Sequence, residues 1–242
     1  SEQITSSMAV PAMLLAMLAV PDLERFDLSS LRSVVTGGAP VPVATLLTFQ
    51  SMGIEMLQGY GLTETCGPGC VIGAKDAKRK MGSTGRPSYH TAVRIVDEEG
   101  SDVALGEAGE VQFAGKHIMK EYWNLPEKTA EAIRDGWFHT GDIAVMDEEG
   151  FITIKDRIKD MIISGGENIS TIEVEAVLYQ HPAVAEAAVV AKPDEKWGET
   201  PCAFVALKEE AESSEEELIQ FCRDNLAHFK CPKKIVFTEL PK

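Results

Sequence analysis

Apolar residues in the first sixty positions recur with two spacings that predict alternating helices and strands. Apolar residues three to five positions apart indicate a helix, because they fall on one side of it, whereas short continuous apolar runs indicate buried strands. The expected elements are a helix from Pro11 through Leu18, a strand over 31–36, a helix over 42–52 that buries Leu46, Leu47 and Phe49, and a strand over 54–57. Glycine-rich loops over 37–40 and 59–64 follow the two strands. This order is typical of an α/β sheet, in which ligands collect at the carboxyl ends of strands.

The pattern changes near residue 92 to short strands without intervening helices. The expected strands cover residues 93–96, 110–113, 143–146 and 151–154. Two copies of Asp-Glu-Glu-Gly, at 97–100 and 147–150, lie between strands. Each predicts a hairpin turn with glycine in the left-handed conformation, and the acidic residues need no other role. This region is therefore expected to be antiparallel β structure.

A smaller α+β unit is expected after Lys159. Helices are predicted over 171–179 and 214–226, and strands over 185–190, 202–207 and 235–237. Ser213 and Ser214 precede Glu216 and Glu217 with the spacing of a capping box, so this acidic stretch indicates a helix start and not a metal site. Because no low-complexity linker separates the two parts, we expect a short hinge near Lys159.

Composition limits the kinds of partner and the cellular compartment that can be expected. The formal net charge of −15 argues against a nucleic-acid partner, which requires clustered cations. Five scattered cysteines without a Cys-x-x-Cys pair indicate reduced thiols and a cytoplasmic protein. The apolar run over 8–20 is short for a transmembrane segment and contains Pro11, so a buried helix is expected, with peripheral membrane attachment left open. The start at Ser1 suggests a piece of a longer protein.

The segment Gln58-Gly-Tyr-Gly-Leu-Thr-Glu64 carries side chains suited to a nucleotide. Glycines around Tyr60 permit a tight turn that exposes its ring to a purine. Thr63 offers a hydroxyl to a phosphate, and Glu64 offers a carboxylate to Mg²⁺. Alone, this segment is more typical of a buried turn with a capping threonine. The other motifs along the chain, its companions in order, favour the nucleotide interpretation.

Two of those companions are Asp142 and Arg157. Asp142 follows Thr140-Gly141 and can accept hydrogen bonds from both ribose hydroxyls, while Arg157 can pair with phosphate or ribose. An ordinary turn aspartate and a surface salt bridge are the alternatives.

The second part of the chain contains candidates for a further ligand. Gly165-Gly166 permits a close approach to the backbone or forms a simple hairpin, and Trp197 is a stacking wall or a core residue. The segment 229–234 is the one basic cluster expected in this acidic chain. It suits an anionic adenine nucleotide such as CoA, although a helix terminus also attracts lysines. No catalytic or metal role is expected for the histidines, which are His139, His181 and His228 among others.

In their order and separation, these segments resemble the adenylate-forming enzymes over essentially the whole chain, and among them the bacterial and mycobacterial fatty-acyl-CoA synthetases. The segments that carry the resemblance are Thr36-Gly-Gly-Ala-Pro40, Gln58-Gly-Tyr-Gly-Leu-Thr-Glu-Thr65, Lys120-Glu-Tyr-Trp-Asn124, Gly136-Trp-Phe-His-Thr-Gly-Asp142, Lys155–Asn168 and Pro193-Asp-Glu-Lys-Trp-Gly-Glu199. The resemblance implies a mixed α/β and α+β fold. Residues 1–158 would be the carboxyl part of a large AMP-binding domain, with an α/β sheet and an antiparallel barrel-like part. Residues 159–242 would be a small carboxyl-terminal domain.

The resemblance also implies roles for single residues. The residues expected at the nucleotide are Gly38, Ala39, Pro40, Gly59, Tyr60, Gly61, Thr63, Asp142 and Arg157. Tyr60 would stack on adenine, Thr63 would contact the α-phosphate, Glu64 would hold Mg²⁺, and Asp142 would bind the ribose with help from Arg157. Lys159 would be the hinge. The residues expected at CoA are Ser164, Gly165 and Gly166, which would line the pantetheine tunnel, and Trp197, Phe229, Lys230 and Lys233.

The implied activity is the ligation of a medium- or long-chain fatty acid to CoA through an acyl-adenylate, with ATP, Mg²⁺ and CoA. The alternative is an enzyme that adenylates aryl or amino acids and loads a carrier protein. Family members carry a phosphate loop ahead of this region and a catalytic lysine after a segment like Leu240-Pro-Lys242, so this chain by itself is expected to be a non-catalytic nucleotide-binding module. Cys231 stands where arginine is common, which weakens a phosphate contact. Ser170-Thr171 replaces a residue–proline pair, which should affect local stability.

Overall fold

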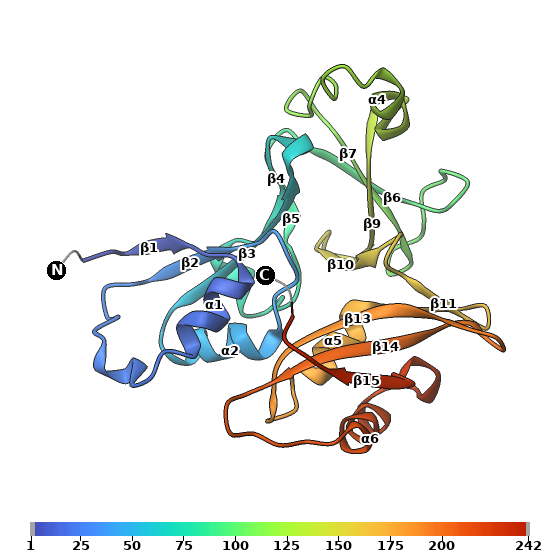
Figure 1. The fold of residues 1–242 in the computed structure, drawn as a ribbon. Coiled ribbons are helices and arrows are strands. Elements are labelled where there is room, and N and C mark those ends of the chain that lie inside the picture. The colour runs from blue at the N-terminus through green and yellow to red at the C-terminus, as the bar shows by residue number, and fades with distance from the viewer. Residues whose placement is uncertain (1–2, 241–242) are drawn as a thin grey trace. The chain divides into compact units, whose positions relative to one another are not determined.

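The computed structural model describes residues 3–240, which divide into two compact units with a boundary between Ile154 and Lys155 (Figure 1). Each unit is described by itself. The last two residues of the Leu240-Pro-Lys242 segment lie outside the described residues. Among the residues the structure describes, no helix is long and apolar enough to cross a membrane.

The amino-terminal part of the first unit is a sheet with helices beside it, as the apolar spacing predicts. Its strands, in sheet order, are β1 (Ser6–Met8), β2 (Ser33–Thr36), β3 (Glu55–Leu62), β4 (Gly67–Val71) and β5 (Arg86–Pro87). β1, β2 and β3 are parallel, and β4 and β5 continue the sheet antiparallel. The helical elements are α1 (Pro11–Leu18), η1 (Leu23–Arg25), α2 (Val43–Ser51), η2 (Thr63–Thr65) and α3 (Ala74–Ala77).

Helix α2 buries a slightly different face from the one expected. Leu46 and Phe49 are buried in the core, but Leu47 is 52% exposed and Thr45 is buried instead. A rotation of about 100° per residue places positions 45, 46 and 49 on one side of a helix and position 47 on the other. The expectation for Leu47 was therefore wrong, because an apolar residue of a helix is buried only if its position faces the core.

Strand β3 is longer than the strand expected over 54–57. It continues through Leu62, and its second half pairs antiparallel with β4, so Gly59–Leu62 is strand and not loop. Glycine permits this close pairing, because a Cβ atom on Gly61 would lie 2.3 Å from the Gly67 carbonyl oxygen. The loop expected over 59–64 is thus reduced to the short helical turn η2 at its end.

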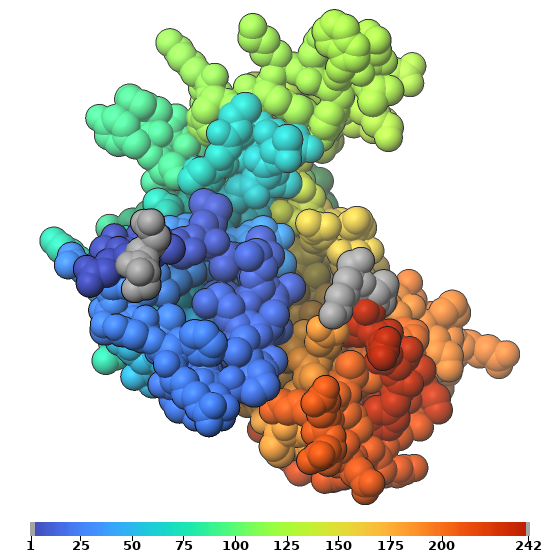
Figure 2. Space-filling view, turned by 60° about the vertical axis from the view of Figure 1, so that its left-hand side comes forward, coloured from blue at the N-terminus to red at the C-terminus, as the bar shows by residue number. Residues whose placement is uncertain are grey.

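The rest of the first unit is the expected antiparallel region. Its elements are β6 (Ala92–Val96), β7 (Ala108–Ala114), α4 (Pro126–Ala132), β8 (Ile133–Arg134), β9 (Trp137–Met146) and β10 (Ile152–Arg157). The sheet order is β10-β9-β7-β6, with β8 paired to β9. Val111 and Phe113 are fully buried at its core. The boundary between the units falls within β10. Figure 2 shows the light-green segment around α4 as a protrusion of this unit with outward-pointing side chains.

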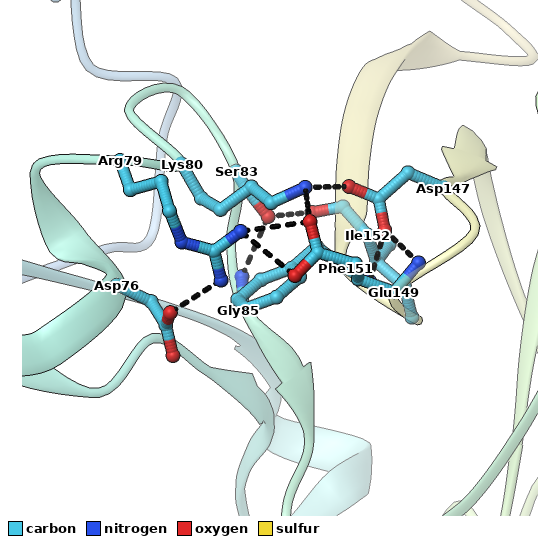
Figure 3. Close-up of polar contacts among 9 residues, drawn as sticks. All are labelled: Asp76, Arg79, Lys80, Ser83, Gly85, Asp147, Glu149, Phe151 and Ile152. Atoms are coloured by element: carbon cyan, nitrogen blue, oxygen red, sulfur yellow. Dashed lines mark hydrogen bonds and ion pairs between the residues drawn. The ribbon is translucent and has the colours of Figure 1, made fainter.

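The two Asp-Glu-Glu-Gly turns form as predicted, but the second has a role that the sequence did not indicate. Gly100 and Gly150 have φ values of 82° and 78°. In the second turn, Lys80 Nζ lies 2.6 Å from Asp147 Oδ2, and Glu149 receives two hydrogen bonds from Arg79 at 2.7 Å (Figure 3). The segment around Arg79 and Lys80 is also a second basic cluster, so 229–234 is not the one such cluster in this chain.

The second unit is the expected small α+β domain. Its elements are β11 (Ile162–Ser164), β12 (Glu167–Ile169), α5 (Thr171–Leu178), β13 (Val184–Asp194), β14 (Gly198–Leu207), α6 (Glu215–Asn225), η3 (His228–Lys230) and β15 (Lys234–Phe237). The sheet order is β12-β11-β14-β13, with β15 parallel to β14. Helix α5 packs on β13, and α6 contacts α5 and β15.

Serine side chains begin both helices of the second unit. The Ser214 hydroxyl accepts a hydrogen bond from the Glu217 N–H, which confirms the expected cap. Ser170 does the same for Glu173, and the next residue, Thr171, donates to the buried carboxylate of Asp156 through its N–H and hydroxyl. Ser170 and Thr171 therefore stabilise the start of α5 directly.

Candidate nucleotide site

The glycine-rich segments after β2 and within β3 lie against each other. A Cβ atom on Gly37 would lie 2.4 Å from the carbonyl oxygen of Gly59, so only glycine fits at position 37. Gly38 follows in a left-handed conformation with φ 83°, and Ala39 and Pro40 are exposed beyond it. The parallel register of β2 and β3 brings these two segments together, so Gly38–Pro40 and Gly59 border one place in the fold.

Tyr60 and Asp142 are hydrogen-bonded to each other, although 82 residues separate them. The Tyr60 hydroxyl donates to Asp142 Oδ2, and Asp142 is only 6% exposed. Burial, and then the carboxylate of Asp142, raise the pKa of Tyr60 above its usual value, so the phenol remains a donor. The Thr140 hydroxyl accepts from the Asp142 N–H and donates to the Val111 carbonyl, which fixes the backbone of the turn.

Glu64 is held by a tyrosine for which the sequence predicts no role. The Tyr122 hydroxyl donates to Glu64 Oε1 at 2.6 Å, and the Met119 N–H donates to the Glu64 carbonyl at 2.7 Å. Burial, and then Glu64, raise the pKa of Tyr122 to about 12. Thr63, beside Glu64 in η2, is exposed. Only the tertiary fold shows the partnership, because 58 residues separate Tyr122 from Glu64.

A polar cluster on β7 and β9 supports the turn that precedes Asp142. Glu110 Oε1 accepts from the Gly141 N–H at 3.0 Å, and Glu110 Oε2 lies 2.8 Å from His139 Nδ1. Gln112 is 1% exposed and bonds to both Glu110 and His139. His139 therefore has an acidic partner on the neighbouring strand, which the sequence did not indicate.

These residues fit a nucleotide with Mg²⁺. Gly141 has φ 72° and open space where a Cβ would stand, and the hydroxyl of buried Thr36 has no partner among the described residues. No cluster of three or more metal-ligating side chains exists in the part of the chain that the structure describes. A single carboxylate such as Glu64 suits Mg²⁺ that is also bound by phosphates, since Mg²⁺ keeps few protein ligands in nucleotide sites.

Arg157 and Lys159 belong to the second unit, and both are exposed. The Arg157 N–H donates to Asp156 Oδ1, and its carbonyl accepts from the Asp160 N–H, so the chain turns sharply here. The roles predicted for the two side chains stay predictions.

The residues expected at CoA form two groups within the second unit. Gly165 and Gly166 make the turn of the β11–β12 hairpin, and Gly165 lies against Trp197, whose ring would be 2.7 Å from a Cβ at that position. Ser164 pairs with Gly198 beside them. Trp197 is 45% exposed and is therefore not a core residue.

The second group contains the basic residues after α6. Phe229 is 43% exposed, with the Lys230 ammonium 5.8 Å from its ring centre. Lys230 Nζ lies 2.7 Å from Glu173, so its charge is already paired, whereas the Lys233 side chain is exposed.

Known proteins resemble this chain over nearly its whole length. Models of the AMP-binding enzyme family match residues 1–123, and those of its C-terminal domain match residues 173–242. Long-chain-fatty-acid–CoA ligase FadD13 of Mycobacterium tuberculosis is 45% identical over 98% of this chain and 47% of its own length. Feruloyl-CoA synthase of Amycolatopsis sp is 43% identical over 98% of this chain and 48% of its own.

A solved structure shares the fold of this chain. The o-succinylbenzoate CoA synthetase of Bacillus subtilis in complex with ATP and magnesium ion superimposes with a TM-score of 0.86 at 35% identity, over 99% of this chain and 49% of that one. The chain spans about half the length of the curated relatives it matches. With both family models matched and the fold shared, the chain belongs to the AMP-binding family of adenylate-forming enzymes.

Proposed function

We propose that this chain is part of an ATP-dependent ligase that joins a carboxylic acid to CoA through an acyl-adenylate. One observation carries the proposal: Tyr60 holds Asp142, and Tyr122 holds Glu64, at two nearby positions of the segment that ends β3. A buried acceptor for a ribose and a partly exposed carboxylate for Mg²⁺ are thus fixed beside each other by one stretch of backbone.

In this proposal each side chain has a defined task. Tyr60 presents its ring to adenine, Asp142 accepts hydrogen bonds from the ribose hydroxyls, and Thr63 donates to the α-phosphate. Glu64 and the phosphates would hold Mg²⁺ together. When bound, Mg²⁺ would offset the negative charge of the phosphates. Gly38, Ala39, Pro40, Gly59 and Gly61 border the nucleotide, and Arg157 assists at the ribose.

The proposed reaction has two steps. A carboxylate oxygen of the acid attacks the α-phosphorus of ATP, and pyrophosphate leaves with the electron pair of the broken P–O bond. The CoA thiolate then attacks the acyl carbon, and AMP leaves as the C–O bond breaks. The residues named above position the reactants and neutralise charge, which is the main source of catalysis in such transfers.

The second unit supplies CoA contacts in this proposal. Ser164, Gly165 and Gly166 offer an open hairpin backbone to the pantetheine arm, with Trp197 as its wall. Phe229 and Lys233 face the adenine nucleotide of CoA, and Lys230 contributes less because Glu173 already pairs with it. Lys159 is the proposed hinge between domains at 1–158 and 159–242.

We further propose a medium- or long-chain fatty acid as substrate, on the similarity to FadD13. The comparable similarity to a feruloyl-CoA synthase makes an aromatic acid the second candidate. Release of AMP with fatty acids and with ferulate, each with CoA or a phosphopantetheinyl carrier protein as acceptor, separates these functions. A cytoplasmic location is proposed because Cys66, Cys70, Cys202, Cys222 and Cys231 are all unpaired.

Binding of the intermediate tests the site directly. A non-hydrolysable fatty-acyl-adenylate mimic is titrated calorimetrically into the full-length ligase and its Asp142→Ala variant. We expect the variant to bind about 10–100-fold more weakly, because hydrogen bonds to a charged group are worth about 1.5–3 kcal/mol. Asp224→Ala, on the exposed face of α6, is the matched control and should bind as wild type. Unchanged binding by Asp142→Ala would contradict the proposed ribose site.

A further inference from the structure

The segment that precedes α4 contacts Glu64 at two points. The Met119 N–H donates to the Glu64 carbonyl at 2.7 Å, which fixes the main chain, and the Tyr122 hydroxyl donates to Oε1 at 2.6 Å, which fixes the carboxylate. A glutamate side chain has several rotatable bonds and loses considerable entropy when it is ordered. The two contacts together remove that freedom before any ligand binds.

Tyr122 is itself held in place by the start of α4. Its N–H donates to the Thr129 hydroxyl at 2.9 Å, and the same hydroxyl donates to the Leu125 carbonyl. Leu125 closes the turn by donating its N–H to the Tyr122 carbonyl at 3.0 Å. The next residue, Trp123, is 82% exposed. The turn therefore directs the phenol inward to Glu64 and the neighbouring indole outward.

The phenol is a reliable donor. The Tyr122 hydroxyl is the donor in this bond, because an ionised carboxylate has only acceptor oxygens. A hydrogen bond from a hydroxyl to a carboxylate is short and stronger than a bond between neutral groups. A carboxylate has about four lone-pair positions, so this one bond leaves capacity for a cation.

We propose that Tyr122 is a positioning residue that orients the Glu64 carboxylate for Mg²⁺ bound with the nucleotide, an inference that rests on the proposed role of Glu64. Mg²⁺ requires nearly octahedral geometry and tolerates misplaced ligands poorly. Groups that orient a metal ligand typically change metal affinity about 10–100-fold when they are removed. Tyr122 acts through Glu64 and does not touch the metal.

A merely structural role would give a different result. If Tyr122 only tied the segment before α4 to η2, its loss would lower the melting temperature and leave the metal affinity unchanged. Phenylalanine preserves the ring and removes one donor, so Tyr122→Phe separates orientation from packing. Tyr89→Phe is the matched control, because Tyr89 is 90% exposed and contacts His90 instead of the site.

The test measures metal binding without turnover. Mn²⁺ binding to the full-length ligase in the presence of the non-hydrolysable nucleotide AMPCPP is followed by electron paramagnetic resonance for wild type, Tyr122→Phe, Tyr89→Phe and Glu64→Gln. We expect the Mn²⁺ dissociation constant to rise about tenfold in Tyr122→Phe and not in Tyr89→Phe. The Mg²⁺ concentration that half-saturates ATP–pyrophosphate exchange should rise by the same factor, with the rate restored at high Mg²⁺.

The outcomes distinguish this inference from the proposed function. Weakened binding in Glu64→Gln with wild-type binding in Tyr122→Phe would overturn the role of Tyr122 and keep that of Glu64. Wild-type binding in both variants would overturn the metal role of Glu64, and the inference with it. A lower melting temperature in Tyr122→Phe with an unchanged Mn²⁺ dissociation constant would assign Tyr122 a structural role and also overturn the inference.

Discussion

Two tyrosine–carboxylate pairs serve the candidate site, Tyr60 with Asp142 and Tyr122 with Glu64, and their surroundings differ. Both phenols donate to a carboxylate from a distant part of the chain. Asp142 is 6% exposed, and its backbone N–H donates a further hydrogen bond to the Thr140 hydroxyl. Glu64 and Tyr122 are only partly buried. The first pair is part of the core between two sheets, and the second lies where water reaches it.

This difference gives the same hydrogen bond two different consequences. Where water is excluded, removal of the phenol leaves a buried carboxylate short of a donor, which destabilises the fold. Where water is present, it replaces the phenol at little cost in stability, and the loss is one of orientation. The buried pair is thus expected to matter for folding and binding together, and the partly exposed pair for metal binding alone.

The largest effect that separates the pairs is expected in the free energy of unfolding. Tyr60→Phe should lower it by about 1–3 kcal/mol, and Tyr122→Phe by less than about 1 kcal/mol. Urea denaturation of the protein and the two variants measures both values, with Tyr89→Phe as the unchanged control. Equal losses in the two variants would show that the second pair is as well shielded from water as the first.

Glu175 extends the comparison to a partly buried carboxylate that accepts a hydrogen bond from a backbone donor, the Val189 N–H, at 2.8 Å. Burial, with a further contribution from Asp156 and Asp160, raises its pKa from 4.5 to about 7. The folded state therefore holds this proton more tightly, so the stability it contributes is complete below pH 4.5 and is lost as the pH rises through about 7. At pH 8, Glu175→Gln should be more stable than wild type by about 3 kcal/mol.

Melting temperatures of wild type and Glu175→Gln between pH 4 and pH 9 check this prediction. The two curves should meet at the acid end and separate towards neutral pH. Glu186→Gln, on the neighbouring strand β13, is a control that should follow wild type. A constant difference between the curves at every pH would mean that Glu175 does not titrate in this range.

The smallest effect is expected at the two Asp-Glu-Glu-Gly turns, where a carboxylate lies at the surface with no phenol donor. Glu149→Gln removes an exposed ion pair with Arg79 and Lys80 and should lower the melting temperature only slightly at low salt and not at all at high salt, because salt screens surface charges. Glu99→Gln, at the matching position of the first turn, should cost nothing measurable. Thermal unfolding at low and high ionic strength compares them. An effect of Glu149→Gln that persists at high salt would exclude a surface ion pair as its cause.

These two turns of identical sequence also show which features local sequence can predict and which it cannot. Each glycine adopts the left-handed conformation that the tetrapeptide predicts, because turn geometry depends on the residues within the turn. The ion pairs of the second turn depend on Arg79 and Lys80, which stand nearly seventy residues earlier. No pattern within the turn contains that information.

The candidate site divides in the same way. Tyr60, Glu64 and Asp142 were predicted from motifs, since a polar or aromatic residue next to glycine is a pattern that the sequence displays directly. Tyr122 and Glu110 were missed, because they act on those residues through contacts between strands and loops that are remote along the chain. Tyr122 lies in a segment that contributed to the family resemblance, and that was the one signal available for it.

The sequence by itself determined most of the longer helices and strands, the division into two parts and the membership of the AMP-binding family. Helical and strand periodicity, turn glycines and motif order are all properties of nearby residues or of residue order. Tertiary structure decided that Gly59–Leu62 is strand and that a tyrosine orients each of the two site carboxylates. These features depend on pairing between distant segments, whose register and distance only the folded chain sets.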